Sequence, residues 1–266
     1  MKNIIRPDAL IFDIDGVLLD VRLSFPEVIR QCVLRGWEMF CCGISDSEGY
    51  TEEHERILKR HGAFNDDYDI AWTLLSACAR SGRKMLSEAF PSAGALAEEL
   101  KTFEGDVVSW VTCRYGGLVP RAPVRSFCAD LYGAGGLHLL ETPMVRAHWS
   151  DLPLPVGIYT GRNELELELA KESLGWQDFP SAHVVHSDSG VLKPSPLGLR
   201  ILCERLGSDS PLFLGDTASD MKAQMAFGKG FFAAIGELLP EAPLVFKDTE
   251  SALASLLDFH ETYKGR

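Results

Sequence analysis

Short runs of apolar residues recur along the chain, each with the length of a buried β-strand. The first is Ala9–Phe12, and the next comes only at residues 156–160. Further runs then follow at regular intervals, at 182–185, 211–214, 231–235 and 243–246. Helical stretches separate most of these later runs. Short buried strands that alternate with helices predict an α/β fold, in which a doubly wound parallel sheet is covered on both faces.

One segment carries two conflicting signals. Residues 164–170 read ELELELA, and this period of two taken alone favours a strand. The flanking residues favour a helix, because Asn163 can cap a helix whose third residue is Glu166. Gly175 stands where such a helix would end. We therefore predict a helix in this segment.

The region between about residues 20 and 142 contains no convincing strand. Glycines separate stretches with helical character at 51–60, 66–80, 93–102, 106–114 and 123–132. This organisation predicts an α-helical domain, residues 20–142, inserted into an α/β core domain. The core would consist of residues 1–19 and 143–266.

Composition and charge narrow the class of protein. Of the 266 residues, 46% are hydrophobic and 24% are charged, which excludes collagen-like, disulfide-scaffold and disordered chains. The net charge of −12 argues against a nucleic-acid partner, because a phosphate backbone requires dense basic patches. The 7 cysteines form no C-x-x-C pair, and the chain has neither a signal-peptide pattern nor an apolar run of membrane-spanning length. We therefore expect a soluble cytoplasmic protein with reduced thiols and no membrane partner.

Four polar segments follow predicted strands. Their sequences are DIDGVL at 13–18, TGR at 160–162, KP at 193–194 and GDTASD at 215–220. In a doubly wound sheet the ligand crevice lies outside the carboxyl ends of the strands. Four segments that are distant in sequence are therefore expected to meet in one place.

Asp13, Asp15, Asp216 and Asp220 would concentrate negative charge in that crevice. Two like charges 4 Å apart repel by about 4 kcal/mol at an effective dielectric constant of 20. Such a cluster requires a cation, and a hard divalent ion that prefers oxygen ligands, such as Mg²⁺, fits best. Lys193 supplies a further positive charge.

An anion site is expected beside these carboxylates. Thr160 offers a hydroxyl group, and the backbone N–H groups near Gly161 lie where a helix should begin. Carboxylates, a hard metal, a lysine and a hydroxyl are the groups used for phosphoryl transfer, where charge stabilisation does most of the work.

Together, DIDGVLLD, YTGR, KP and GDTASD resemble the four motifs of haloacid dehalogenase-like hydrolases, in order and in spacing. The resemblance covers the core, about residues 7–22 and 150–250. The helical insertion resembles the type 1 cap of that superfamily, as in phosphoglycolate phosphatase-like members. Each motif alone is a weak signal, whereas four in the right order after predicted strands are a strong one.

The resemblance implies a role for each matched residue. Asp13 would be the nucleophile that forms an aspartyl-phosphate, and Asp15 would protonate the leaving alcohol and later take a proton from water. Dehalogenase members lack an acid at the position of Asp15, so its presence points to phosphate esters. Thr160, Gly161 and Lys193 would bind the transferring phosphoryl group.

The metal ligands implied by the resemblance are Asp13, the backbone carbonyl of Asp15, Asp216 and Asp220, the last either directly or through water. The sequence leaves open whether Mg²⁺ is preferred to Mn²⁺ or Co²⁺. Arg162 is expected at the surface or near a carboxylate rather than on the substrate.

The helical insertion should select the substrate. Arg22 and Asn65 are its candidate substrate contacts, although helix capping explains Asn65 better. The partner is expected to be a small phosphorylated metabolite, bound by a monomer or a homodimer.

Three functions remain open at this point. The first is a Mg²⁺-dependent phosphatase acting on a small phosphate monoester. The second is a phosphomutase of the same fold, similar to β-phosphoglucomutase. The third is a catalytically silent protein that binds a phosphate ligand for regulation.

Overall fold

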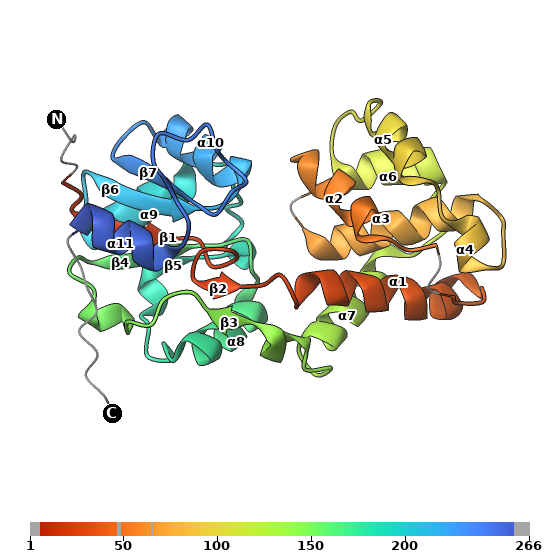
Figure 1. Cartoon of the computed structure of the whole chain (residues 1–266), viewed down its shortest axis with the longest axis horizontal. Helices are drawn as coiled ribbons and strands as arrows, with labels where there is room; N and C mark the ends of the chain where they lie inside the picture. Colours follow the sequence, from red (N-terminus) through yellow and green to blue (C-terminus); the bar gives the residue numbers. More distant parts are fainter. Residues whose placement is uncertain (1–5, 47–48, 65, 258–266) are drawn as a thin grey trace. The chain divides into compact units, whose positions relative to one another are not determined.

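The computed structural model describes residues 6–46, 49–64 and 66–257 (Figure 1). The chain divides into two compact units. Residues 1–21 and 141–266 form the first unit, and residues 22–140 form the second. None of the described helices combines the length and the apolar character needed to cross a membrane.

The first unit is built on a six-stranded sheet with the order β5-β4-β1-β6-β7-β8. Its strands are β1 (Ala9–Phe12), β4 (Val156–Tyr159), β5 (Val184–Val185), β6 (Pro211–Gly215), β7 (Phe231–Ile235) and β8 (Val245–Phe246). All neighbours pair in parallel, and Ile11 of β1 lies opposite Gly157 of β4 and Phe213 of β6. The predicted doubly wound parallel sheet is therefore confirmed. The strand predicted at 182–185 is shorter than expected, because Ser181–His183 form a 3₁₀ turn.

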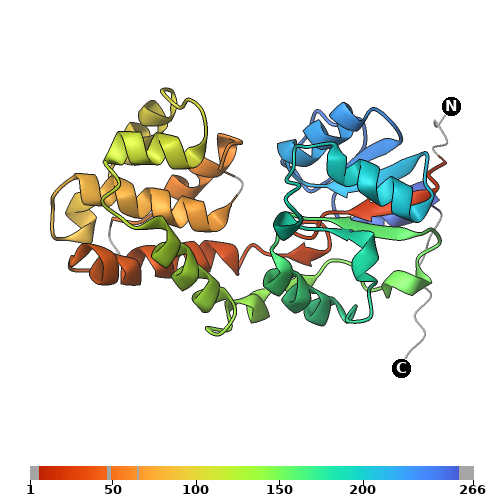
Figure 2. The same cartoon turned by 180° about the vertical axis from the view of Figure 1, so that it is seen from behind.

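Residues of β1 alternate between two apolar layers, one on each face of the sheet. Leu10 and Phe12 pack into the layer that includes residues of α8 (Glu164–Leu174) and α11 (Thr249–Leu257). Ile11 packs into the opposite layer, with residues of α9 (Leu197–Leu206) and α10 (Ala218–Phe227) (Figures 1 and 2). Each fully buried apolar side chain contributes about 1.5–3 kcal/mol. This doubly covered sheet gives the polar loops at its strand ends a rigid base.

Helix α8 forms where the two sequence signals conflicted. The Asn163 side chain accepts the backbone N–H of Glu166 at 3.0 Å, and the Glu166 carboxylate accepts the backbone N–H of Asn163 at 3.0 Å. Gly175 ends the helix with a φ of 71°. Leu167 is buried whereas Leu165 is 59% exposed, so the alternating leucines do not share a face. The predicted capping box and helix are confirmed.

A short antiparallel pair joins the two ends of the inserted region. It consists of β2 (Leu19–Asp20) and β3 (Thr142–Pro143). The residue pattern predicts no strand between about residues 20 and 142, and this pair of two-residue strands lies at the edges of that interval. Strands so short carry too few residues for a periodic signal.

The second unit contains seven α-helices among its described residues. They are α1 (Phe25–Cys41), α2 (Glu52–Arg60), α3 (Asp67–Arg80), α4 (Leu86–Ala89), α5 (Ala93–Leu100), α6 (Val107–Tyr115) and α7 (Arg121–Tyr132). Helices α1, α3 and α7 pack on one another, and α3 is buried without a break from Tyr68 to Cys78. An α-helix that is buried all round marks the centre of a helical unit.

All five predicted helices of this region are present, but the longest helix, α1, was not predicted. Its signal exists in the sequence, because its buried apolar residues have helical spacing and Pro26 stands in the first turn, where proline is tolerated. The buried residues that define this face are Phe25, Val28, Ile29, Cys32, Val33 and Trp37.

Candidate active site

The predicted site residues come from the carboxyl ends of three adjacent strands. Asp13 directly follows β1, Thr160 follows β4 and Asp216 follows β6, and these strands are neighbours in the sheet. Lys193 comes from the loop between β5 and α9, and its Nζ lies 2.8 Å from Oδ1 of Asp13. The fold therefore brings together residues that are up to about 200 positions apart in the chain.

Three carboxylates form a compact cluster at this edge. Asp13, Asp216 and Asp220 each place one oxygen within 4.8 Å of the others. The Lys193 ammonium bridges two of them, at 2.8 Å from Asp13 and 2.7 Å from Asp220. Asp13 is 4% exposed and Asp220 is fully buried. Three carboxylates thus face one ammonium in a region largely removed from water.

The electrostatics of the cluster follow from burial and crowding. Burial raises the pKa of Asp13 to about 7, with repulsion from Asp220 and Asp15 adding to the effect and Lys193 opposing it. Burial, with repulsion from Asp220 and Asp13, also raises the pKa of Asp216 well above its usual range. For Lys193 burial alone would lower the pKa, but attraction to Asp13 and Asp220 outweighs it and raises the pKa. Lys193 therefore stays charged, but its single positive charge does not balance the three carboxylates around it.

The donor set fits a hard divalent cation. Oδ1 of Asp216 is buried and has no hydrogen-bond partner among the described residues. A buried oxygen without a donor is costly unless something else, such as a cation, binds it. Oδ2 of Asp220 accepts from the backbone and hydroxyl of Thr217, at 3.0 and 2.6 Å. Its Oδ1 also has no hydrogen-bond partner among the described residues, but it forms an ion pair with Lys193 at 2.7 Å. Asp13 and Asp216 are therefore the side chains best placed for a metal, and Asp220 holds Lys193.

Gly16 allows the loop after β1 to approach the cluster closely. Its φ is +69°, a conformation that favours glycine. A Cβ at this position would overlap the carboxylate of Asp216. The glycine of the DIDG motif thus serves a steric purpose as well as a conformational one.

Thr160 is suited to binding an anion. Its Oγ1 accepts the backbone N–H of Arg162 at 3.1 Å, and its own backbone N–H donates to the carbonyl of Val185 at 3.0 Å. In the part of the chain that the structure describes, the hydroxyl donates to no protein acceptor, so its proton is available for an incoming oxygen. Gly161, next in the chain, is exposed, and its Cα faces open space.

Asp15 lies against a buried arginine. The Nε and Nη2 atoms of Arg162 donate to Oδ1 of Asp15 at 2.9 and 2.6 Å. The side chain of Arg162 is 1% exposed, whereas that of Asp15 is 35% exposed. The prediction that Arg162 lies near a carboxylate is confirmed, and the alternative of a surface position is wrong.

A family model described as haloacid dehalogenase-like hydrolase matches residues 7–228. The chain belongs to this hydrolase family. The match spans both the strand-end motifs and the inserted helical region. No curated protein matches the chain.

Solved structures give the same fold for this hydrolase. A phosphatase from Thermococcus thioreducens is 26% identical, with a TM-score of 0.68, and the match covers 95% of this chain and 100% of that one. A protein from Lactobacillus plantarum assigned as a phosphoglycolate phosphatase is 18% identical, with a TM-score of 0.56, over 96% and 99% of the two chains. A protein from Thermotoga maritima assigned as a β-phosphoglucomutase is 18% identical, with a TM-score of 0.53, over 94% and 98%. The hydrolase therefore shares its fold with a phosphatase and with proteins assigned as a phosphoglycolate phosphatase and a β-phosphoglucomutase.

Neither of the two predicted substrate contacts of the inserted region belongs to the described part of the first unit. Arg22 is exposed and is the first residue of the second unit. Asn65 lies outside the described residues. The neighbouring Asp66 caps α3, accepting the backbone N–H groups of Tyr68 and Asp69. The capping role that we weighed for Asn65 is therefore performed by Asp66.

Sequence reasoning missed the part that Glu141 plays. Its buried carboxylate accepts from Nη2 of Arg162 at 3.0 Å on each oxygen. Arg162 carried a signal, because it belongs to the TGR segment after a strand. Glu141 carried none, since it lies in no motif and its partner is 21 residues away.

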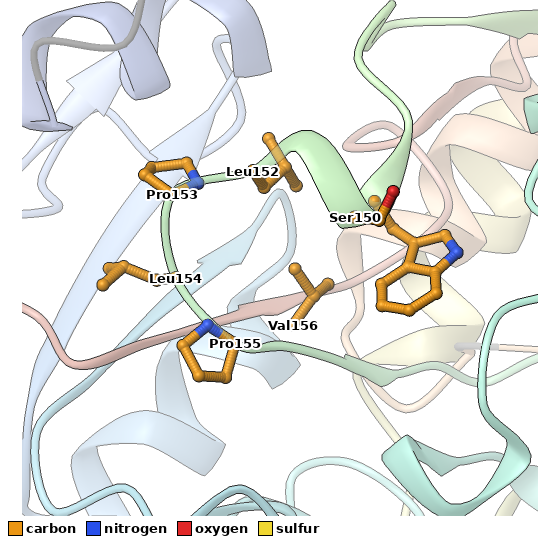
Figure 3. Close-up of a pocket in the computed structure, with 7 residues that line it drawn as sticks. Ser150, Leu152, Pro153, Leu154, Pro155 and Val156 are labelled. Carbon is orange, nitrogen blue, oxygen red and sulfur yellow. The ribbon is translucent and has the colours of Figure 1, made fainter.

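A shallow hollow of about 330 Å³ elsewhere in the first unit is not the site of the chemistry. Its lining runs along a single segment from Trp149 to Val156 (Figure 3). Val156 begins β4, whereas Thr160 follows its other end. The labelled lining residues are apolar apart from Ser150, so the hollow offers no groups for phosphoryl transfer.

Proposed function

We propose that this hydrolase is a Mg²⁺-dependent phosphatase that hydrolyses a small phosphate monoester through an aspartyl-phosphate on Asp13. The observation that carries the proposal is the buried cluster in which Asp13 contacts Lys193 and lies beside Asp216, with Asp15 two residues away. The similarity to a phosphatase from Thermococcus thioreducens supports the same reaction.

In the first step a carboxylate oxygen of Asp13 attacks phosphorus and forms an O–P bond. The P–O bond to the alcohol breaks, its electron pair goes to the ester oxygen, and Asp15 supplies the proton that this oxygen needs. In the second step water attacks phosphorus, Asp15 takes a proton from the water, and the bond to Asp13 breaks. Inorganic phosphate leaves, and both aspartates return to their starting states.

The remaining residues stabilise charge during these steps. The Lys193 ammonium, held by Asp13 and Asp220, provides a fixed positive charge for the phosphoryl oxygens. Thr160 donates its hydroxyl proton to one of those oxygens, with the neighbouring Gly161 backbone beside it. Mg²⁺, held by Asp13, Asp216 and the backbone carbonyl of Asp15, would supply the positive charge that the cluster lacks.

The substrate belongs to the class of small phosphorylated metabolites. We infer this from the polar character of the strand-end site and from the net charge of −12, which disfavours a nucleic-acid phosphate as the target. The strand-end residues recognise the phosphoryl group that all such substrates share, so a panel is required to identify the alcohol.

Phosphate release from a panel of phosphate monoesters tests the proposal, with Mg²⁺ and with a chelator. The panel contains phosphoglycolate, sugar phosphates, nucleoside monophosphates and phosphoserine. We expect metal-dependent release from at least one ester, and a loss of about 10³-fold or more in Asp13→Asn. Asp209→Asn is the matched control, because the Asp209 side chain is 95% exposed.

Three outcomes contradict the proposal. Near-normal activity of Asp13→Asn rules out the aspartyl-phosphate route. Accumulation of an isomeric sugar phosphate instead of inorganic phosphate identifies a phosphomutase. Binding of phosphate analogues without turnover of any ester identifies a regulatory protein.

A further inference from the structure

A buried ion network stands behind the residue that handles protons. The Arg162 guanidinium contacts Asp15 through Nε and Nη2 and contacts Glu141 through Nη2. The side chains of Arg162 and Glu141 are 1% and 0% exposed. Removing these two charges from water carries a large desolvation penalty before their attraction is counted. Buried ionic groups of this kind are often found at functional sites, which raises the question of what this network does for Asp15.

The arginine is fixed from several directions. Its Nη1 donates to the carbonyl of Glu166 in α8 at 3.3 Å, and its backbone N–H donates to the hydroxyl of Thr160. Its backbone carbonyl accepts from Ser187 at 3.0 Å. A guanidinium held at its backbone and at its tip has little rotational freedom, so it can position whatever it binds.

The contacts to Asp15 have a geometry suited to proton transfer. Nε and Nη2 both donate to the same oxygen, Oδ1. A protonated carboxyl group keeps one carbonyl-like oxygen that accepts hydrogen bonds, while the other oxygen carries the proton. Oδ1 can therefore remain bound to Arg162 while Oδ2 gives up or receives a proton. The 35% exposure of the Asp15 side chain keeps it accessible to substrate and water.

Glu141 completes the arrangement. Its two oxygens each receive Nη2 of Arg162 at 3.0 Å, so it orients the guanidinium. It also supplies a buried negative charge to balance the arginine, which otherwise would present a full positive charge to Asp15. Glu141 immediately precedes β3, and β3 pairs with β2 just after the Asp13–Asp15 loop. The network therefore connects three separate segments of the first unit at one carboxylate.

We propose that Arg162 and Glu141 are positioning residues for Asp15, which hold its Oδ1 so that Oδ2 is aimed for proton transfer to the leaving alcohol. This inference rests on the proposed phosphatase function. A positioning role for Arg162 and Glu141 differs from a purely structural role in one measurable respect. A structural pair affects all substrates alike, whereas a misaimed acid slows most strongly those substrates whose leaving group needs a proton.

The test compares kcat/KM for two classes of ester in the full-length enzyme with Mg²⁺. One is an alkyl phosphate turned over by the wild type, whose alkoxide is a poor leaving group, and the other is p-nitrophenyl phosphate, whose phenolate leaves without help. The ratio kcat/KM reports steps through release of the alcohol, so hydrolysis of the aspartyl-phosphate does not enter.

We expect Arg162→Lys, which keeps the charge but loses the forked donors, to lower kcat/KM for the alkyl ester about 100-fold and for the nitrophenyl ester less than about 5-fold. Glu141→Gln should lower kcat/KM for the alkyl ester, relative to that for the nitrophenyl ester, by about 10-fold. Asp15→Asn sets the upper limit of the selective loss. KM for the alkyl ester should change little in the two positioning variants.

Two further variants control for general effects. Arg205→Lys changes an arginine of the same unit whose Nη1 donates to the carbonyls of Ala182 and Val184, away from the site. Phe179→Leu removes buried packing without touching the network, and so controls for lost stability. Both should leave the ratio between the two esters unchanged.

Each outcome separates this inference from the function on which it rests. If Arg162→Lys and Glu141→Gln lower kcat/KM equally for both esters, or for neither, the proposed positioning role is wrong. The proposed phosphatase function is not affected by that outcome. If Glu141→Gln shows the selective loss and Arg162→Lys loses both activities together with its fold, Glu141 alone carries the inference. If the wild type releases no phosphate in a metal-dependent manner, the proposed function itself is wrong and the inference falls with it.

Discussion

Each unit of the molecule contains a cluster of carboxylates and cations, and the two clusters are balanced differently. In the first unit, Asp13, Asp216 and Asp220 face Lys193, so that three carboxylates meet one ammonium. The crowding leaves Oδ1 of Asp216 buried without a hydrogen-bond partner among the described residues. In this cluster the carboxylates outnumber the cation.

The cluster of the second unit is complete by itself. Asp66 and Asp69, at the start of α3, face Arg121 and Arg125 of α7. Arg121 binds both oxygens of Asp69 at 2.8 Å, and Arg125 bridges Asp66 at 2.8 Å and Asp69 at 3.0 Å. Two carboxylates thus meet two guanidinium groups, Arg121 through a forked contact and Arg125 through Nη1 alone, so the charges balance.

A charge cluster is therefore recognised as functional by the opposite charge that it lacks. A balanced and fully hydrogen-bonded cluster fixes helices to each other, as α3 and α7 are fixed here. An unbalanced cluster costs free energy until something binds, and that cost is the signature of a binding site. If this is correct, substitutions in the two clusters should have opposite consequences for activity and stability.

The largest effect is expected for Asp216→Asn. Loss of a metal-facing carboxylate should lower phosphatase turnover by about 10³-fold, equivalent to about 4 kcal/mol of transition-state stabilisation. It should also remove most of the stabilisation by Mg²⁺, which for the wild type reaches about 2.7 kcal/mol at one hundred times the Kd. Thermal unfolding with and without Mg²⁺ measures this, and Asp209→Asn is the control. If Mg²⁺ stabilises the variant as much as the wild type, Asp216 does not bind the metal, and the proposed contrast between the two clusters is wrong.

Much of the fold could be predicted from residues that are neighbours in sequence. The strand lengths and the helices between them give the parallel sheet, and Asn163 with Glu166 marks the start of α8 despite the contrary period of two. Helix α1, by contrast, was not predicted, although its buried apolar residues from Phe25 to Trp37 have helical spacing. Local patterns are therefore informative wherever they are read in full.

The candidate site divides in the same way. The residues after strand ends, such as Asp13 and Asp216, could be predicted to meet because topology fixes where parallel strands end. The network behind Asp15 could not be predicted, because Arg162 and Glu141 belong to separate segments and their pairing depends on three-dimensional packing. No sequence rule identifies which charged residues will be fully buried, since most are exposed.

The next largest effect is expected in the second unit, for Asp69→Asn. Asp69 is 8% exposed and receives both arginines, so neutralising it leaves Arg121 without a charged partner in the cluster and Arg125 with Asp66 alone. Because the Arg121 and Arg125 side chains are 38% and 30% exposed, water can hydrate them in part, and we expect the free energy of unfolding to fall by about 2 kcal/mol. We expect kcat/KM per folded molecule to change less than about 3-fold. Chemical denaturation and activity assays on the same samples measure both quantities. Glu98→Gln, in an exposed pair with Lys101, should change stability by less than about 0.5 kcal/mol. Loss of turnover at unchanged stability would instead place the Asp69 cluster in the active site.

The smallest effect concerns pH and metal together. Burial raises the pKa of Asp13 from 3.8 to about 7, so between these values the folded state holds a proton that the unfolded state has lost. Without metal, the contribution of Asp13 to stability therefore falls as the pH rises through this interval, by up to about 1.4 kcal/mol per pH unit. Asn at this position does not titrate, so the free energy of unfolding of the wild type minus that of Asp13→Asn should decrease from pH 5 to pH 7. Saturating Mg²⁺ favours the ionised carboxylate, and the decrease should then disappear. A difference that is independent of pH in the absence of metal would mean that Lys193 already compensates Asp13, and that the imbalance resides in Asp216 alone.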